Sequence, residues 1–311
     1  MLTFRSPAEL PVDFGPSAVT VGKFDGVHGG HRAVIQRLRA IAEERGLSAV
    51  VVTFDRHPLS LLNPDSCPEA LVSNERKIDL LASTGIDATL ILTFDRALSD
   101  LSPEAFVTST IVNALHGRVV LVGADFRFGA GGAGDVTLLR ELGRKHGFEV
   151  LMVDDVTPDG ERRVSSTWIR ELLADGQVEA AAALMGSLPT VRGVVVHGQH
   201  RGRSMGIPTA NLSPELEGYV PADGVYAAWL KTDGRVYPAA VSVGNNPTFE
   251  GVPDKQVEAH VLDEEFELYG ETVEISFVKR VRPMEKFADA RALAAQMQED
   301  VRQIAEVLSS E

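Results

Sequence analysis

The feature that most constrains the fold is an alternation between short runs of β-branched residues and longer helical runs, which continues to about residue 186. Residues 48–54 (SAVVVTF) and 88–94 (ATLILTF) are continuously apolar, as strands buried on both faces of a sheet are. Residues 31–46, between two such runs, place their apolar side chains on one helical face and end at a glycine. Because strands that alternate with helices favour right-handed crossovers, this half is predicted to be a doubly wound parallel sheet with helices on both faces.

Helix signals support this reading of the first half. Ser102 followed by Pro103 is a good N-terminal signal for a helix over 102–117. Further helices are predicted over 74–85 and 135–147, and the stretch 165–186 also has a helical pattern.

The rhythm changes after residue 186, where short strand-like runs are broken by glycine and proline. Asp233-Gly234, between two of these runs, is a hairpin signal. The spacing predicts a compact antiparallel sheet or small β-barrel, and a helix over 287–308 closes the chain. The simplest division is therefore an α/β domain over 1–186 and a small barrel domain over 187–311.

Composition excludes several classes of protein. The net charge of −14 argues against a nucleic-acid binder, which would present a basic face. No apolar run approaches the roughly 18 residues of a membrane span, and the first residues lack the pattern of a signal peptide. The single cysteine cannot form an internal disulfide bond. We therefore expect a cytoplasmic protein that binds neither nucleic acid nor membranes and self-associates weakly.

The stretch GKFDGVHGGH (22–31) follows the first apolar run and leads into a helix. Glycines let a ligand approach the backbone, and unpaired N–H groups with the positive end of the helix dipole make an anion site. His28 at the mouth of the helix and His31 in its first turn are predicted to lie on one side. Two imidazoles there could donate to phosphate oxygens and stabilise a leaving pyrophosphate. A zinc site is disfavoured because cysteine partners and the HExxH spacing are both missing.

The other strands of the first half also end in small, polar or basic residues. These ends are TFDRHP (53–58), GADFRFG (123–129) and RRVSSTWIR (162–170). Because ligands of open parallel sheets bind beyond the carboxyl ends of the strands, the set predicts a nucleotide cleft.

A run of glycines over 129–134 fits the pattern GxGxxG and has Asp154 about 20 residues further on, as a dinucleotide site requires. It does not follow its strand directly, and it stands after the fourth strand of the series rather than the first. We interpret it as a flexible loop over the cleft and expect no NAD site.

The second informative stretch is HGQHRGRSMGIPTANL (197–212). Its glycines and arginines could cradle phosphates, yet it is one residue too short for a Walker A loop and has Arg203 where lysine belongs. Taken alone, it is an ambiguous anion-binding loop.

The motif G-x-F-D-G-x-H-x-G-H before a helix resembles the signature of the HxGH nucleotidyltransferases, specifically the FMN adenylyltransferase module of bacterial riboflavin kinase/FAD synthetases. TFDRHP, VGADFRFG and VSSTWIRELL extend the resemblance. It implies that His28 and His31 contact the triphosphate of ATP and that Ser165 belongs to a phosphate-binding element on the opposite side. As a residue of a tight turn, Asp25 fits a structural role equally well. The resemblance assigns the binding of ATP and its phosphates to Gly22, Phe24, Asp25, Gly30, Asp125, Arg163, Ser166, Thr167 and Arg170.

The second half resembles the riboflavin kinases, with PTAN (208–211), VGNNPTF, VEAH and FVKRVRPMEKF in that family's order. The resemblance implies that Thr209 and Asn211 approach Mg²⁺ and the ATP phosphates. Glu258 would be the base that takes the proton from the riboflavin 5′-hydroxyl; without the resemblance it reads as a solvated residue on an alternating strand. Asn245, Asn246 and Pro247 read as turn residues. The kinase phosphate-binding set it implies is Gly202, Arg203, Gly206, Pro208, Thr209 and Asn211.

The two resemblances together imply a bifunctional enzyme that converts riboflavin to FMN and FMN to FAD with ATP and Mg²⁺. Two other readings stay open from the residues: another nucleotidyltransferase with an accessory barrel, such as a cytidylyltransferase, and a flavin-binding module without catalysis.

Overall fold

A computed structural model gives the structure of the chain and describes residues 1–153, 157, 162–197, 207–244, 256–262, 264 and 267–310. The chain forms two compact units, one of Met1–Pro68 with Asn74–Ser165 and the other of Glu69–Ser73 with Ser166–Glu311. This division follows packing alone, so the functional domain limits of 1–186 and 187–311 stay a prediction.

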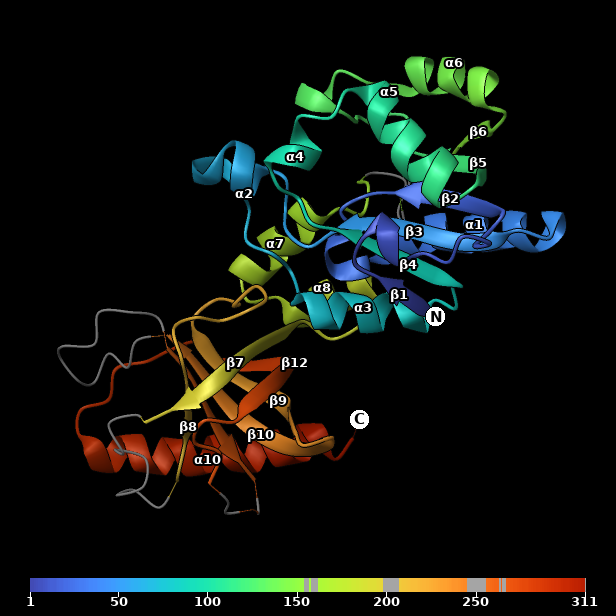
Figure 1. The fold of residues 1–311 in the computed structure, drawn as a ribbon. Helices are drawn as coiled ribbons and strands as arrows, with labels where there is room; N and C mark the ends of the chain where they lie inside the picture. The colour runs from blue at the N-terminus through green and yellow to red at the C-terminus, as the bar shows by residue number, and fades with distance from the viewer. Residues whose placement is uncertain are drawn as a thin grey trace. The chain divides into compact units, whose positions relative to one another are not determined.

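The first unit is built on a parallel sheet whose described strands have the order β1-β4-β3-β2-β5-β6 (Figure 1). From β2 the chain adds β3 and β4 on one side and then returns to add β5 and β6 on the other, so the order reverses beside β2. Such a reversal is the switch point at which doubly wound sheets bind ligands. The predicted doubly wound parallel sheet is confirmed. Its strands are β1 (Leu2–Phe4), β2 (Ser17–Val21), β3 (Ser48–Phe54), β4 (Ala88–Leu92), β5 (Gly117–Val122) and β6 (Glu149–Met152).

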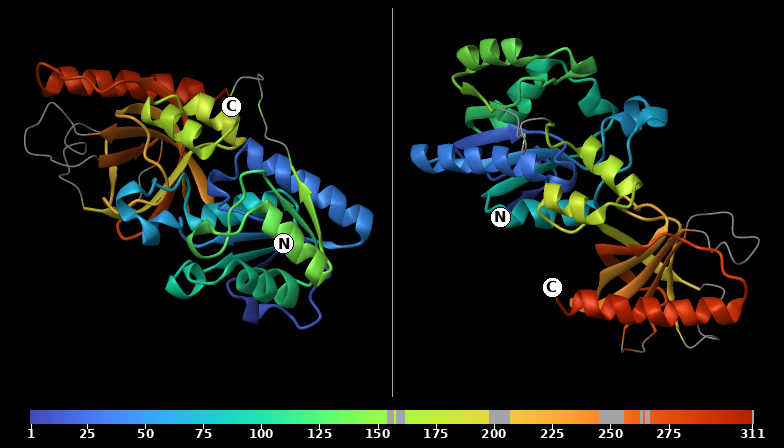
Figure 2. Two further views of the ribbon diagram at one scale, coloured as in Figure 1. Left: turned by 90° about the horizontal axis from the view of Figure 1, so that it is seen from above. Right: turned by 180° about the vertical axis from the view of Figure 1, so that it is seen from behind.

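Helices cover both faces of this sheet (Figures 1 and 2). On one face, Leu38 and Ile41 pack with Ala18 and Val119 of the strands. On the other face, strand residues such as Val50 join a larger cluster of buried apolar side chains from the helices that follow β4 and β5. The helices are α1 (Gly29–Arg45), α2 (Leu59–Leu62), α3 (Asn74–Ser83), α4 (Arg96–Ser99), α5 (Pro103–Phe106), the π-helical η4 (Val107–Ala114) and α6 (Val136–His146).

The second unit holds a closed antiparallel barrel with the strand order β10-β11-β8-β7-β12-β9 among its described residues. Buried side chains such as Tyr226 and Phe277, whose rings lie edge to face, fill its interior. The closed barrel and its terminal helix confirm the fold predicted for the second half. Its elements are α7 (Ser166–Ala174), α8 (Val178–Met185), β7 (Thr190–Val196), β8 (Ala210–Leu212), β9 (Gly224–Thr232), β10 (Arg235–Gly244), β11 (Gln256–Val261), β12 (Thr272–Arg282) and α10 (Ala290–Leu308).

The helix α10 lies along the outside of the barrel (Figure 2). Its residues Ile304 and Leu308 are buried against Val225 and Ala227 of β9. Outward-facing residues of β9 are therefore covered by α10, while their neighbours face the barrel interior. Among the described residues, no helix combines the length and the hydrophobicity that a membrane crossing requires.

Local signals explain where several elements begin and end. The Ser102 hydroxyl accepts a hydrogen bond from the Ala105 N–H, as the cap signal predicted. Asp233 and Gly234 both have positive φ, which is the geometry of the tight hairpin turn expected between β9 and β10. The helical stretch 165–186 is broken between α7 and α8, where Gly176 has a φ of +76°.

Candidate active sites

The connection from β2 to α1 carries the histidine pair. Its backbone is strained, because the non-glycine residues Phe24 and Val27 have φ values of +48° and +41°. Such conformations cost on the order of 1–3 kcal/mol each and cluster at functional sites. The Thr53 hydroxyl of β3 donates a hydrogen bond to the carbonyl of Lys23 and so anchors the connection to the sheet. The connection thus holds one defined conformation beside the switch point.

His28 is the residue immediately before α1, and His31 lies in its first turn. Their rings are stacked, with centroids 3.7 Å apart and planes inclined by 22°. The ring of Phe24 lies 5.0 Å from that of His31 and flanks the pair. Helical spacing therefore brings both imidazoles to one side of the helix N-terminus, where backbone N–H groups favour an anion.

The surroundings of His31 keep its imidazole neutral. Burial lowers its pKa well below the ordinary value, and the positive charges of His28, Lys23 and Arg163 lower the pKa further. The His31 Nδ1 atom is buried and has no hydrogen-bond partner among the described residues. A neutral imidazole carries one N–H, so this ring can donate one hydrogen bond to an oxygen of an anionic ligand.

Two glycines make room for these rings. A Cβ atom at Gly30 would lie 3.2 Å from His28 Cε1 and 3.4 Å from the carbonyl oxygen of Val164. A Cβ atom at Gly22 would lie 3.1 Å from the ring of Phe24. Both positions are tighter than ordinary van der Waals contact, so glycine permits the ring positions.

Asp25, Asp125 and Arg163 also lie in the first unit. Asp125 and Arg163 form an exposed ion pair of 3.3 Å. Asp25 lies in the short helix η2 (Asp25–Val27), against which α3 packs. The buried Lys77 of α3 donates a hydrogen bond to the Phe54 carbonyl. Burial lowers the pKa of Lys77, and this effect is larger than the opposite effect of the negative charges of Asp25 and Asp55. Lys77 was not expected as a site residue, because a lysine in a helix such as α3 is usually a solvated charge.

Ser166, Thr167 and Arg170 begin α7, which packs with the second unit. There the Arg170 guanidinium donates a hydrogen bond of 2.7 Å to the carbonyl of Glu69. Contact between these residues and a triphosphate bound by His28 and His31 stays a prediction.

The glycine run 129–134 makes several backbone hydrogen bonds. Phe128 and Gly134 exchange two backbone hydrogen bonds, and Ala130 donates a third to Leu101. A Cβ atom at Gly129 would lie 2.6 Å from the nitrogen of Pro103, so this glycine serves close packing. Backbone pairing thus closes the run on itself, and its movement over the cleft as a flexible loop stays a prediction. Asp154, the acidic partner of a dinucleotide site, lies outside the described residues.

In the barrel, Glu258 of β11 lies directly opposite Asn211 of β8. The Thr209 hydroxyl donates to Glu258 Oε2 at 3.4 Å, and Asn211 Nδ2 donates to the Thr209 carbonyl at 3.4 Å. On the other side of β11, Ser242 of β10 lies opposite Glu258. The structure thus brings Thr209 and Asn211 together with Glu258, which is 49 residues from Thr209 in the sequence.

Pro208 immediately precedes this group, and its carbonyl accepts a hydrogen bond from His260. Gly202, Arg203 and Gly206, expected to bind ATP phosphates, lie outside the described residues, as do Asn245, Asn246 and Pro247. His260 was not expected as a site residue. The signal that could have identified it is its place two residues after Glu258, on the same face of an alternating strand.

Comparisons with known proteins agree for both halves. A model of FAD synthetase matches residues 11–168, and a model of riboflavin kinase matches residues 185–308. Proteins named bifunctional riboflavin kinase/FMN adenylyltransferase from Escherichia coli (strain K12) and Bacillus subtilis (strain 168) are 37% identical over 283 residues and 35% identical over 288 residues. In each case the match covers 91% of this chain and 90% of the relative.

The whole chain also resembles a solved structure. A crystal structure described as a macrolide-efflux protein from Streptococcus pneumoniae superposes with a TM-score of 0.81 and 31% sequence identity, covering 96% of each chain. Both halves are thus matched in the same order and over nearly their full length. The chain belongs to the bifunctional riboflavin kinase/FMN adenylyltransferase family.

Proposed function

We propose that this chain phosphorylates riboflavin to FMN in residues 187–311 and adenylylates FMN to FAD in residues 1–186. ATP is the co-substrate of both steps. The observation that carries the proposal is that both halves match their family models, while Thr209, Asn211 and Glu258 come together in the barrel and the His28 and His31 rings stack at the start of α1.

In the adenylyl transfer, an oxygen of the FMN phosphate attacks the α-phosphorus of ATP. The new P–O bond forms as the bond to the β-phosphate oxygen breaks, and pyrophosphate leaves. The nucleophile is already ionised, so positioning and charge stabilisation supply most of the acceleration. His28, His31 and the N-terminus of α1 stabilise the leaving group through N–H donors. Glycine at position 30 leaves room for the ring of His28, and glycine at position 22 leaves room for that of Phe24.

In the kinase reaction, the 5′-hydroxyl of riboflavin attacks the γ-phosphorus of ATP, and ADP leaves. Glu258 accepts the hydroxyl proton, a role that requires the carboxylate to lie within hydrogen-bond reach of that oxygen. The Thr209 hydroxyl, at 3.4 Å, orients this carboxylate. Pro208, with Gly202, Arg203 and Gly206 of the same motif, binds the phosphates in this proposal.

A magnesium ion fits the donor set of the barrel site. Thr209, Asn211 and Glu258 offer a hydroxyl, an amide carbonyl and a carboxylate, which are the hard oxygen donors that Mg²⁺ prefers. Thr209 and Asn211 would hold the ion, together with phosphate oxygens and water. When bound, the ion neutralises charge on the transferring phosphates.

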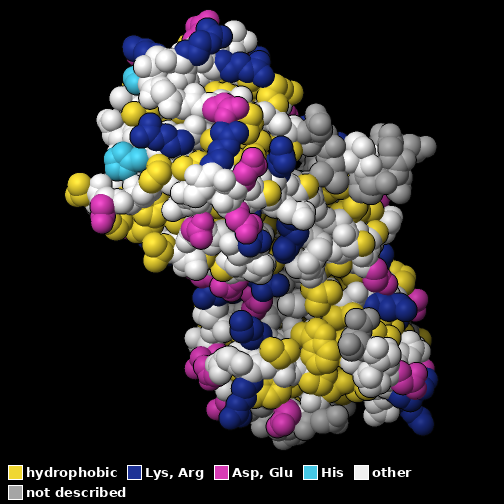
Figure 3. All heavy atoms as spheres, turned by 90° about the vertical axis from the view of Figure 1, so that its right-hand side faces the viewer, with side chains coloured by type: hydrophobic (Ala, Val, Ile, Leu, Met, Phe, Trp, Pro, Cys, Tyr) yellow, Lys and Arg dark blue, Asp and Glu magenta, His cyan; other side chains and the backbone are white. Residues whose placement is uncertain are grey.

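The proposal includes a cytoplasmic location and action on small molecules. The single cysteine suits a reducing compartment. On the face drawn in Figure 3, basic and acidic side chains are interspersed, which supports the expectation that nucleic acid is not a ligand. We expect self-association to be weak.

Incubation of the purified chain with riboflavin and MgATP, followed by separation of the flavins, tests the proposal. FMN followed by FAD is the expected result. Unchanged riboflavin would support a flavin-binding module instead, and turnover that depends on CTP would support a cytidylyltransferase.

A further inference from the structure

We propose that His260 is a positioning residue of the kinase site, which fixes the backbone at Pro208 and Thr209 by donating a hydrogen bond to the Pro208 carbonyl. This inference rests on the proposed kinase function of the barrel. It assigns a role to a residue whose side chain contacts a main-chain carbonyl of the site.

The pairing of β8 with β11 ends just before it reaches Pro208 and Thr209, so the backbone of these two residues is not held by strand pairing to β11. The two strands pair at Glu258–Asn211 and Ala259–Ala210, and β8 begins at Ala210. Pro208, two residues earlier, has no N–H and cannot extend the ladder as a donor. Its carbonyl oxygen still requires a partner when it is enclosed.

His260 supplies that partner. Its Nδ1 atom lies 2.8 Å from the Pro208 oxygen, which is a normal hydrogen-bond length. Because a carbonyl oxygen only accepts, Nδ1 must carry the proton. The His260 side chain thus supplies the Pro208 carbonyl with the donor that strand pairing does not provide there.

A second bond fixes the next residue. Asn211 Nδ2 donates to the Thr209 carbonyl at 3.4 Å, so consecutive carbonyls are held by side chains from two strands. The hydroxyl of Thr209 then points at Glu258 Oε2. His260 and Glu258 lie two residues apart on one face of β11. The same strand therefore positions the proposed base, Glu258, and the histidine that holds the Pro208 carbonyl next to Thr209.

The chemistry of the substitutions separates this role from simple packing. Asparagine places an amide nitrogen the same number of bonds from Cβ as Nδ1 of histidine. Glutamine places its amide nitrogen where Nε2 would be, and alanine removes the donor. A positioning role therefore predicts that His260→Asn retains the activity that His260→Ala and His260→Gln lose.

The test measures both activities of the full-length chain and its His260 variants. We expect His260→Ala and His260→Gln to lower kcat of riboflavin phosphorylation about 10- to 100-fold, the scale of a displacement near 1 Å. KM for MgATP should rise while KM for riboflavin stays within about twofold of its wild-type value. His260→Asn should stay within about threefold of wild type in kcat. Circular dichroism reports folding of the barrel, FAD formation from supplied FMN should stay at the wild-type rate, and Lys231→Ala, at an exposed position on β9, is the control.

Equal kcat in the wild type and His260→Ala would overturn the proposal, as would an asparagine variant no better than alanine. A wild-type chain that leaves riboflavin unchanged would contradict the proposed function instead. In that case ¹⁵N NMR of the histidine ring still tests the contact. A proton on Nδ1 is expected, and a neutral ring protonated on Nε2 would refute the contact.

Discussion

At the residue scale, the imidazoles of His28 and His31 stack at the mouth of α1, where Gly30 leaves room for the ring of His28. Burial and neighbouring positive charges lower the pKa of His31, so its ring is neutral before an anion binds. Arg163, one of these positive charges, is itself paired with Asp125. A neutral His31 ring has one N–H, which it can donate to an oxygen of an anionic ligand.

The lowered pKa of His31 predicts how stability changes with pH. The unfolded chain binds a proton near pH 6.5, whereas the folded chain does so only at a lower pH. The unfolded state therefore holds more protons below about pH 6.5, and this residue's contribution to stability falls as pH drops toward the folded pKa. Calorimetry of wild type and His31→Gln at pH 5.5 and 7.5 checks this. The variant should lose less stability on acidification, and parallel losses would contradict the assignment.

Gly30→Ala tests the space beside His28. The added methyl group would press on the His28 ring at 3.2 Å, so we expect FAD formation from FMN to fall about tenfold or more. Alanine has the higher helix propensity, by about 1 kcal/mol. This gain offsets the cost of moving the His28 ring, so the free energy of unfolding should change little. Phosphorylation of riboflavin by the same variant is the control. Normal FAD formation with normal stability would show that the ring position is not critical.

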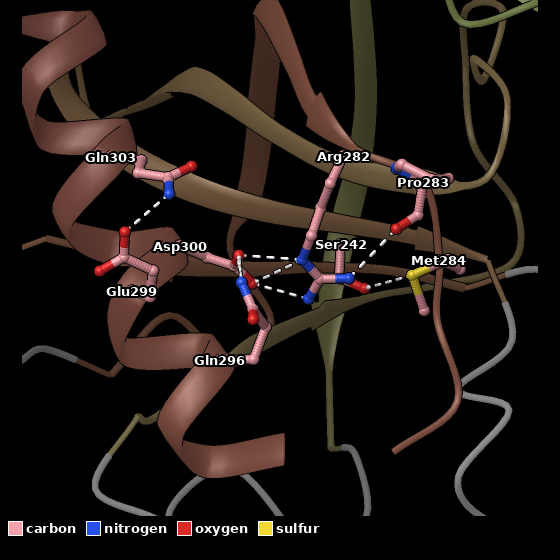
Figure 4. Close-up of polar contacts among 8 residues, drawn as sticks. All are labelled: Ser242, Arg282, Pro283, Met284, Gln296, Glu299, Asp300 and Gln303. Carbon is pink, nitrogen blue, oxygen red and sulfur yellow. Dashed lines mark hydrogen bonds and ion pairs between the residues drawn. The ribbon is translucent and has the colours of Figure 1, made fainter. Parts of the chain in front are cut away.

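At the element scale, α10 is fastened to the barrel by a buried ion pair at the end of β12 (Figure 4). The Arg282 Nη2 atom lies 2.7 Å from Asp300 Oδ2, and Nε lies 2.9 Å from Oδ1. Gln296 donates a further bond to Asp300, and Arg282 donates one to the Pro283 carbonyl. Asp300 is 3% exposed, so removing it would leave the Arg282 charge buried without its partner.

We expect Asp300→Ala to destabilise the barrel by about 3–5 kcal/mol, because breaking a buried pair leaves an uncompensated charge. Glu306→Ala on the same helix removes one member of an exposed pair with Arg302 and should change stability little. Urea unfolding followed by tryptophan fluorescence, to which Trp168 on α7 and Trp229 on β9 both contribute, compares the two variants. Equal effects of both variants would contradict a stabilising role of the Arg282–Asp300 pair.

The elements show what the sequence can predict and what it cannot. The runs that became β3 and β4 were visible because they are apolar on both faces. The strands β1 and β8 have three residues each, too few for a period to emerge, and tertiary pairing alone defines them. The close packing of Gly129 against Pro103 was not visible in the sequence, because glycine permits close packing as readily as motion.

The candidate sites follow the same logic. A local motif predicted the His28–His31 arrangement, because three residues along one helix fix the geometry. The grouping of Thr209 with Glu258 depends on strand register, which residue spacing does not reveal and which only the family resemblance anticipated. His260 was missed because its partner is a backbone carbonyl, and no sequence motif records a main-chain acceptor.

At the scale of the whole molecule, two folds with separate site residues lie on one chain. A chain so built should lose either activity without the other, since His28 and His31 belong to the first unit and Thr209, Asn211 and Glu258 to the second. FMN is the product of one step and the substrate of the other, so supplying FMN bypasses the first.

The measurement that tests this division most directly separates the flavins made by two variants of the full-length chain. The double variant His28→Ala/His31→Ala should convert riboflavin to FMN and form no FAD. Asn211→Ala should make little FMN from riboflavin yet still convert supplied FMN to FAD. Loss of both activities in either variant, with folding intact by circular dichroism, would contradict the account.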